Sequence, residues 1–198
     1  LFFIVFIPIL LSQFIHKLNT QSKKEIEIAI LQPNIDPYYN KYKKSNEELF
    51  ELIKNQSKDY ISQNTRYLIL PEGYFDSGLG IDLNFINNSK LKSRIDKFLN
   101  QYKNLNLVVG AQSYKIYPES KNPPTNTSNR ISDGRWVDIY NSAFQFSNGN
   151  ESQFYHKSKL VVGVEFMPYK KILEPIIGEL LLDFGGTIAT RGIQNYRT

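Results

Sequence analysis

The stretch YLILPEGYF, residues 67–75, decides the fold class of this chain. Its first four residues are apolar, which is typical of a short strand buried on both faces by flanking helices. No turn residue separates this run from Pro71 and Glu72. The carboxyl ends of central strands are where α/β folds place ligands. The stretch therefore predicts an α/β domain with Glu72 at a functional edge of its sheet.

Segments on either side of this stretch alternate between strand and helix patterns. Residues 25–32, EIEIAILQ, place isoleucine at every second position, and NLVVGAQSY at 106–114 is another buried apolar run. Two amphipathic helices lie between these strands, and the first begins at a capping box formed by Ser45 and Glu48. Their apolar stripes comprise Leu49, Leu52, Ile53, Tyr60 and Ile61 in the first helix, and Leu91, Ile95, Phe98, Leu99 and Tyr102 in the second.

Two later stretches predict a strand pair. IYNSAFQF at 139–146 and YHKSKLVVGVEFMP at 155–168 are separated by the turn SNGNES, and the sequence contains no internal repeat. Strands that alternate with helices and are followed by paired strands favour an α/β domain. We therefore assign residues 25–198 to one such domain, with its central strands covered by helices.

Charge and cysteine usage narrow the possible functions. The net charge is +5 and the lysines are spread along the chain, without a run of five basic residues, so we expect no nucleic-acid partner. The sequence has no cysteine. Disulfides, zinc–thiolate sites and a cysteine nucleophile are therefore excluded within these 198 residues.

The first fifteen residues, LFFIVFIPILLSQFI, are strongly apolar but shorter than the roughly 20 residues that a membrane-spanning helix needs. The basic segment and the small-residue cleavage site of a signal peptide are missing. We predict that residues 1–15 are the second half of a transmembrane helix, and that residues 16–24 are a linker. A buried helix of a soluble protein and an interfacial anchor are the alternatives.

The stretch 155–168 carries cations at its start and an acid near its end. Strand alternation puts Lys157 and Lys159 on one face and His156 on the other, where we expect the histidine to be exposed or hydrogen-bonded locally. A lysine at a strand end can stabilise the oxyanion of an acyl transfer, but a charged strand edge also discourages pairing with other chains. Glu72 is likewise either a general base, with its pKa raised by partial burial, or a solvated turn residue.

Several motifs occur in the chain order of a known family. They are LILPEGYF (68–75), VVGAQSY (108–114), YNSAFQF (140–146) and YHKSKLVVGVEFMPY (155–169). In this order and spacing they resemble the nitrilase, or carbon–nitrogen hydrolase, superfamily. ILQPNIDPY (30–38), FGGTIATRG (184–192) and the apolar opening make the sequence most similar to its membrane-bound branch, the bacterial apolipoprotein N-acyltransferases. The resemblance covers nearly the whole chain and implies a nitrilase-like four-layer α-β-β-α sandwich.

The resemblance also implies a Glu–Lys–Cys triad. Glu72 matches the general base, Lys157 matches the triad lysine, and Glu165 matches a second essential glutamate that supports the site, which leaves Lys159 as a neighbour. In the family the cysteine follows a segment like LLLDFGGTIATRGIQNYRT at 180–198. We expect the sequence to be a truncated piece of a longer protein that is inactive alone, with a dead paralogue as the alternative.

For the complete protein, the family implies a two-step acyl transfer without a metal or an organic cofactor. A phospholipid acyl chain passes to a cysteine thioester and then to the α-amine of a diacylglyceryl-cysteine on an apolipoprotein. The partners are thus a phospholipid donor, an apolipoprotein acceptor and the membrane, and the full-length protein is a monomer. The resemblance implies the bacterial inner membrane, with the catalytic domain on its periplasmic face.

Two other functions remain open from the residues alone. One is a soluble amidase or nitrilase of the same superfamily, and the other is a non-catalytic, membrane-tethered nitrilase-like module. Aromatic and apolar residues beside the triad positions either line a membrane-facing mouth or pack in the core. They are Tyr74, Phe75, Phe166 and Met167.

Overall fold

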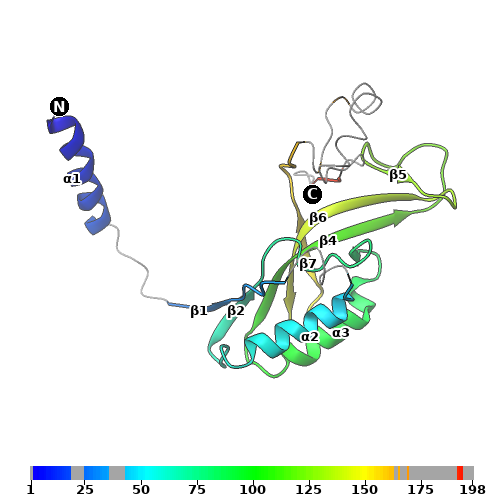
Figure 1. Cartoon of the computed structure of the whole chain (residues 1–198), viewed down its shortest axis with the longest axis horizontal. Coiled ribbons are helices and arrows are strands. Elements are labelled where there is room, and N and C mark those ends of the chain that lie inside the picture. Colours follow the sequence, from blue (N-terminus) through cyan, green and yellow to red (C-terminus); the bar gives the residue numbers. More distant parts are fainter. Residues whose placement is uncertain are drawn as a thin grey trace.

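The computed structural model of this chain describes residues 2–18, 25–35, 43–162, 165, 169 and 191–193. This part of the chain forms three α-helices and a seven-stranded mixed sheet (Figure 1), which confirms the predicted α/β class. The helices are α1 (Phe2–Leu18), α2 (Asn46–Ser57) and α3 (Lys90–Leu99), with a short 3₁₀ helix η2 (Ile86–Asn88) before α3. The strands are β1 (Glu27–Ile30), β2 (Thr65–Ile69), β3 (Ile81–Asp82), β4 (Asn106–Tyr117), β5 (Asn129–Arg130), β6 (Trp136–Ser147) and β7 (Gln153–His156).

The sheet is parallel on one side and antiparallel on the other. Its strand order is β1-β2-β4-β6-β5, while β3 also pairs with β4 and β7 also pairs with β6. The strands β1, β2 and β4 run parallel, and β4 and β6 form a long antiparallel ribbon from Asn106 opposite Ser147 to Tyr117 opposite Trp136. The pairing of β6 with β7 confirms a strand pair in this part of the chain, but β7 ends at His156 and so includes only the first two residues of the predicted stretch 155–168.

Helices α2 and α3 lie together on one face of the sheet (Figure 1). The capping box at the start of α2 is present, since the Ser45 hydroxyl accepts from the Glu48 amide at 3.2 Å and the Ser45 amide donates to the Glu48 carboxylate at 2.7 Å. Phe50 of α2 meets Phe98 of α3 edge to face, with ring centroids 5.8 Å apart. These contacts hold both helices against the same core.

The predicted apolar stripes are largely confirmed. In α3 the stripe residues are buried, with Tyr102 packed partly buried against them. In α2 the stripe residues Leu49 and Ile53 are fully buried. The prediction that Tyr60 lies on the buried stripe of this helix is wrong. The helix ends at Ser57, and the Tyr60 side chain beyond it is 80% exposed.

The prediction that the central strands are buried on both faces is wrong for the described residues. Leu68 of β2 is buried against the helices, whereas its neighbours Tyr67 and Ile69, which point to the other face, are only partly buried. The cause is that α2 and α3 both cover one face. The second face, where Ile28 and Ile30 of β1 are exposed, is called the open face below.

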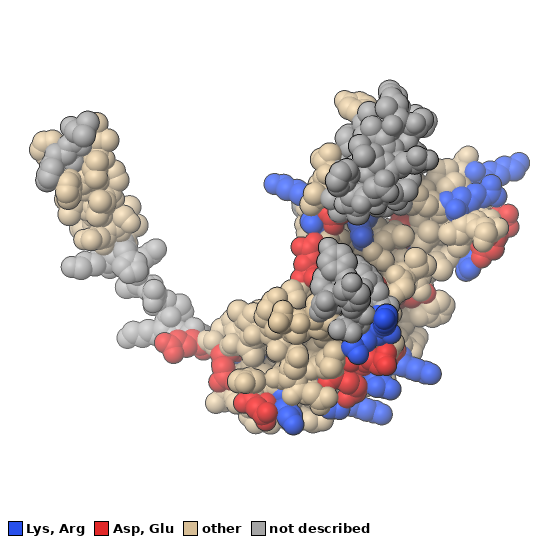
Figure 2. Space-filling model, in the orientation of Figure 1, with Lys and Arg blue, Asp and Glu red and all other residues tan. Residues whose placement is uncertain are grey.

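Helix α1 carries apolar side chains on all sides. The side chains that the structure describes in it, residues 3–15, are exposed and include no charged group (Figure 2). The helix contains Pro8 and continues past Ile15 to Leu18. In the described part of the chain, no helix has both the length and the apolar character needed to cross a membrane. The assignment of residues 1–15 to half of a transmembrane helix therefore stays a prediction.

Candidate active site

Glu72 lies on a short loop that leaves the sheet between β2 and β3. The loop, residues 71–73, sits directly over Gly110 of β4, whose amide donates to the Pro71 carbonyl at 3.2 Å. The Gly110 carbonyl accepts from the Tyr74 amide at 2.8 Å. A Cβ atom at position 110 would lie only 2.4 Å from the Glu72 Cα atom, so glycine allows the loop to come this close. Glu72 thus sits where the sequence predicts, just past the carboxyl end of β2.

The three residues assigned to the site from the sequence lie together. The Lys157 ammonium donates to Glu72 Oε1 at 3.1 Å and is 3.0 Å from Glu165 Oε2. Lys157 follows β7 directly, and its amide donates to the Asn141 carbonyl of β6 at 2.7 Å. The sheet therefore fixes the backbone from which the lysine reaches both carboxylates.

Asn141 is a site residue that the sequence analysis missed. Its side-chain amide donates to Glu72 Oε1 at 2.6 Å and to Glu165 Oε1 at 2.7 Å. Strand alternation places Asn141 on the open face of β6. The sequence does contain a feature that could have indicated Asn141. It is a polar residue inside the YNSAFQF stretch, on the face of the strand opposite to the buried Phe144 and Phe146.

The carboxylate of Glu72 does not behave as the sequence predicts. Its side chain is 65% exposed, and the hydrogen bonds from Asn141 and then Lys157 lower its pKa below the ordinary value. The expectation that burial raises the pKa of Glu72 is therefore wrong. These donors stabilise the charged form more than the modest desolvation destabilises it.

The other two charged groups are also held in their ionised forms. Burial alone would raise the pKa of Glu165, but donation from Asn141, from the Val161 amide and from Lys157 lowers it overall. Burial would lower the pKa of Lys157, yet its pairing with Glu165 and Glu72 raises it. The cluster thus holds two carboxylates around one ammonium at neutral pH.

A polar cavity of about 360 Å³ opens beside Glu72. It is lined by Glu72, Gly73, Asp76, Gln112, Asn141 and Arg191. Arg191 belongs to the FGGTIATRG stretch, and its amide donates to the Glu165 carbonyl at 3.0 Å. Neither Arg191 nor Asp76 was singled out in the sequence.

Other residues from the sequence analysis lie outside this cluster. Lys159 is exposed, whereas His156 is partly buried and forms a hydrogen bond with the Ser142 hydroxyl at 2.7 Å, a local contact of the kind expected. Tyr74 and Phe75 pack in the core, while Phe166 and Met167 fall outside the described residues. In the described ranges, no group of three or more histidine, aspartate or glutamate side chains is arranged to hold a metal ion.

Comparison with known proteins adds no relative. No family model matches the chain, and no curated protein matches its sequence. The resemblance to the nitrilase superfamily therefore has only the order of the sequence motifs behind it, and the cluster of Glu72, Asn141, Lys157 and Glu165 is the structural feature that bears on function.

Proposed function

We propose that this chain is part of an apolipoprotein N-acyltransferase of the nitrilase superfamily, with Glu72, Lys157 and Glu165 in its catalytic site. The observation that supports this most is the position of the Lys157 ammonium, 3.1 Å from one carboxylate and 3.0 Å from the other. Glu72 and Lys157 come from positions 85 residues apart. A carboxylate that accepts protons beside a fixed cation is the arrangement that acyl transfer through a thiolate requires.

In the proposed first half-reaction, Glu72 takes the proton of a cysteine thiol supplied from outside these 198 residues. The thiolate attacks the ester carbonyl carbon of a phospholipid, and Lys157 stabilises the oxyanion that forms. The carbon–oxygen bond of the ester then breaks, Glu72 returns the proton to the departing lysophospholipid oxygen, and a thioester remains.

In the proposed second half-reaction, the α-amine of the apolipoprotein attacks the thioester. Glu72 accepts a proton from the amine, Lys157 again stabilises the oxyanion, and the carbon–sulfur bond breaks. The proton passes to the departing thiolate, so the site returns to its starting state with an amide formed. No metal or organic cofactor takes part in these steps.

The lowered pKa of Glu72 suggests a second role for Lys157 in the proposed reaction, in addition to stabilising the oxyanion. A carboxylate whose charged form is stabilised is a weak base toward a thiol of ordinary pKa, about 8.5. A nearby ammonium stabilises the thiolate and so lowers the pKa of the thiol. We infer that Lys157 assists both the proton transfer and the oxyanion.

The proposal extends to the fold and the location of the complete protein. The sheet, with α2 and α3 on one face, would supply two layers of the four-layer α-β-β-α sandwich, and further chain would cover the open face. The exposed apolar helix α1 would belong to a membrane segment that anchors the domain at the periplasmic face of a bacterial inner membrane.

The test uses the full-length gene and an assay of acyl transfer from a phospholipid to a diacylglyceryl-cysteine peptide. Glu72→Gln and Lys157→Met should each lower the activity by at least about 10³-fold, because each removes a group used in both half-reactions. Lys159→Met is the matched control, since this exposed lysine should be dispensable. Activity near wild type in either site variant, with normal expression, would exclude the proposed site.

The second candidate is a soluble amidase, which would use the same Glu–Lys pair on small amides. The exposed apolar residues of α1 argue against it. Fractionation of cells that express the full-length protein separates the two, because a soluble amidase would stay in the supernatant. Amide hydrolysis without acyl transfer would also favour the amidase.

A further inference from the structure

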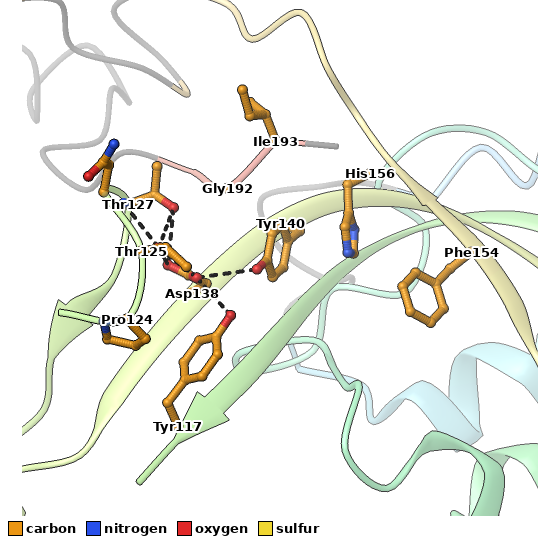
Figure 3. A pocket seen from close by; sticks show the side chains of 11 residues that line it. Tyr117, Pro124, Thr125, Thr127, Asp138, Tyr140, Phe154, His156, Gly192 and Ile193 are labelled. Carbon is orange, nitrogen blue, oxygen red and sulfur yellow. Dashed lines mark hydrogen bonds between the residues drawn. The ribbon is translucent and has the colours of Figure 1, made fainter. Parts of the chain in front are cut away.

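A second cavity, of about 760 Å³, lies against the far end of the β4–β6 ribbon (Figure 3). Its lining residues are Tyr117, Pro124, Thr125, Asn126, Thr127, Asp138, Tyr140, Phe154, His156, Gly192 and Ile193. The lining includes one carboxylate and neither lysine nor arginine. This size is within the range of small-molecule sites.

The carboxylate of Asp138 is fully buried and is surrounded by hydroxyl groups. Thr125 and Thr127 donate to it at 2.9 and 3.1 Å, and Tyr117 and Tyr140 donate at 3.1 and 3.2 Å (Figure 3). A hydroxyl has one proton and two lone pairs. The Thr125 oxygen also accepts from the Thr127 amide at 3.2 Å, whereas the hydroxyl oxygens of Thr127, Tyr117 and Tyr140 each keep a lone pair that can accept from a donor.

Aromatic rings form another side of the cavity. The ring of Tyr140 stacks on that of His156, with centroids 3.9 Å apart, and Phe154 lies 5.1 Å from His156. Burial lowers the pKa of His156 to about 4, so this ring adds no positive charge at neutral pH. The negative charge of Asp138 is thus met by hydroxyl dipoles and aromatic rings, both of which attract a cation.

We propose that this cavity binds a primary ammonium group. The hydroxyl oxygens of Thr127, Tyr117 and Tyr140 would accept its N–H protons, and Asp138 behind them would supply the compensating charge. A ligand that only accepts hydrogen bonds, or an anion, finds no donor in these hydroxyls.

This site is distinct from the candidate active site. Tyr140 and Ser142 point to one face of β6, and Asn141, which binds Glu72, points to the other. The segment 191–193 touches both places, because Arg191 lines the cavity beside Glu72 while Gly192 packs on the Tyr140 ring. The inference does not rest on the proposed acyl transfer.

The test is a titration of the full chain, held in a non-ionic detergent, with ethylammonium chloride. Methyl resonances of Thr125 and Thr127, observed by NMR in threonine-labelled protein, report on the site directly. We expect saturable shifts with ethylammonium, at least about tenfold weaker binding of tetramethylammonium, which has no N–H donor, and no saturation with ethanol.

Variants test whether ethylammonium binding depends on the Asp138 carboxylate. Asp138→Asn should weaken ethylammonium binding at least about tenfold, whereas the same change at the half-exposed Asp133 should leave it unchanged. Because Asp138 also anchors the loop around Thr125, its variant counts only if its circular dichroism spectrum and its other threonine methyl resonances match those of wild type. If it does not fold, Tyr140→Phe decides, since it keeps the ring, removes one acceptor and should weaken binding about threefold.

The ammonium group could belong to a phospholipid headgroup or to a free amine, and one further ligand distinguishes the two. Glycerophosphoethanolamine that binds at least as tightly as ethylammonium indicates a phospholipid headgroup, and weaker binding indicates a free amine. Either result supports an ammonium site. The proposal is overturned if ethylammonium produces no saturable shift at Thr125 and Thr127, or if a folded Asp138→Asn or Tyr140→Phe protein binds it as tightly as wild type.

Discussion

At position 141 a neutral amide holds two carboxylates that would otherwise repel each other. Asn141 donates to Glu72 and to Glu165, and Lys157 pairs with both. One amide and one ammonium thus order two carboxylates and leave one net negative charge. The residual negative charge keeps the lysine protonated and leaves Glu72 able to accept a proton.

This arrangement predicts how Glu72 titrates. In Asn141→Ala the pKa of Glu72 should rise, because the largest cause of its lowering is the Asn141 hydrogen bond. A carboxyl with a lowered folded-state pKa adds stability above its unfolded value, near 4.5, and loses it as the pH falls through the folded value. The variant should therefore lose less stability on acidification than wild type does. NMR titration of ¹³C-labelled glutamate and acid unfolding measure both effects.

The control is Asn150→Ala, which removes an exposed side-chain amide that donates to the Asn148 carbonyl. It should leave the Glu72 titration unchanged. An unaltered Glu72 titration curve in folded Asn141→Ala would contradict the assigned hydrogen bond.

At the scale of elements, the site depends on how the loop after β2 crosses β4. The loop gains its position from backbone hydrogen bonds between Gly110 and Pro71, Tyr74 and Phe75, and from the absence of a side chain at position 110. Leu68 and Leu107 lie side by side in neighbouring strands below it and are fully covered by the helices. The core thus supports the loop that carries Glu72.

Gly110→Ala tests this packing. The new Cβ atom would come within 2.4 Å of the Glu72 Cα atom and 2.7 Å of the Pro71 carbonyl oxygen, so backbone must move. We expect destabilisation of about 1–3 kcal/mol and a loss of acyl transfer by the full-length protein of about 10²-fold. Thermal melting and the acyl-transfer assay measure the two effects.

A matched substitution shows whether the effect of Gly110→Ala comes from its contact with the loop or from added side-chain volume on the sheet in general. Ala143 is the exposed cross-strand neighbour of Gly110, and Ala143→Val should keep most of the stability and activity. Wild-type activity in Gly110→Ala would show that the close approach of the loop is not needed.

At the scale of the whole molecule, the two faces of the sheet differ. Helices α2 and α3 cover part of one face, and the open face carries Ile28, Ile30 and the exposed Tyr155 of β7. Apolar side chains gathered on an open face favour association with other chains. We therefore expect the 198-residue chain to self-associate and to melt without a sharp cooperative transition.

Ile30→Lys should lower the fraction of large species, measured by sedimentation velocity, because it places a charge on the open face. Phe85→Lys is the matched control, since Phe85 is similarly exposed but lies on the loop before η2. Helix α1 is common to all three proteins, so differences between them report on the sheet. A monomeric wild-type chain with a cooperative transition would contradict this prediction.

The local pattern of the sequence was enough to predict the class of fold and the position of its main elements. Apolar spacing indicated the helices and strands, the Ser45–Glu48 pair indicated a helix start, and the end of an apolar run indicated Glu72. Such signals are readable because they depend on residues close together in the chain. The choice of Lys157 over Lys159 came from the resemblance to the nitrilase superfamily.

Only the tertiary structure decided which strand faces are covered and which polar groups meet. Strands at 67–70 and 106–114 look alike in sequence whether helices cover one face or both. Asn141 acquires its role from a loop 69 residues away, and Asp138 is joined to Thr125 and Thr127 by the folding of a long loop. Contacts of this kind depend on strand register and chain path, and these are set by packing of the whole domain.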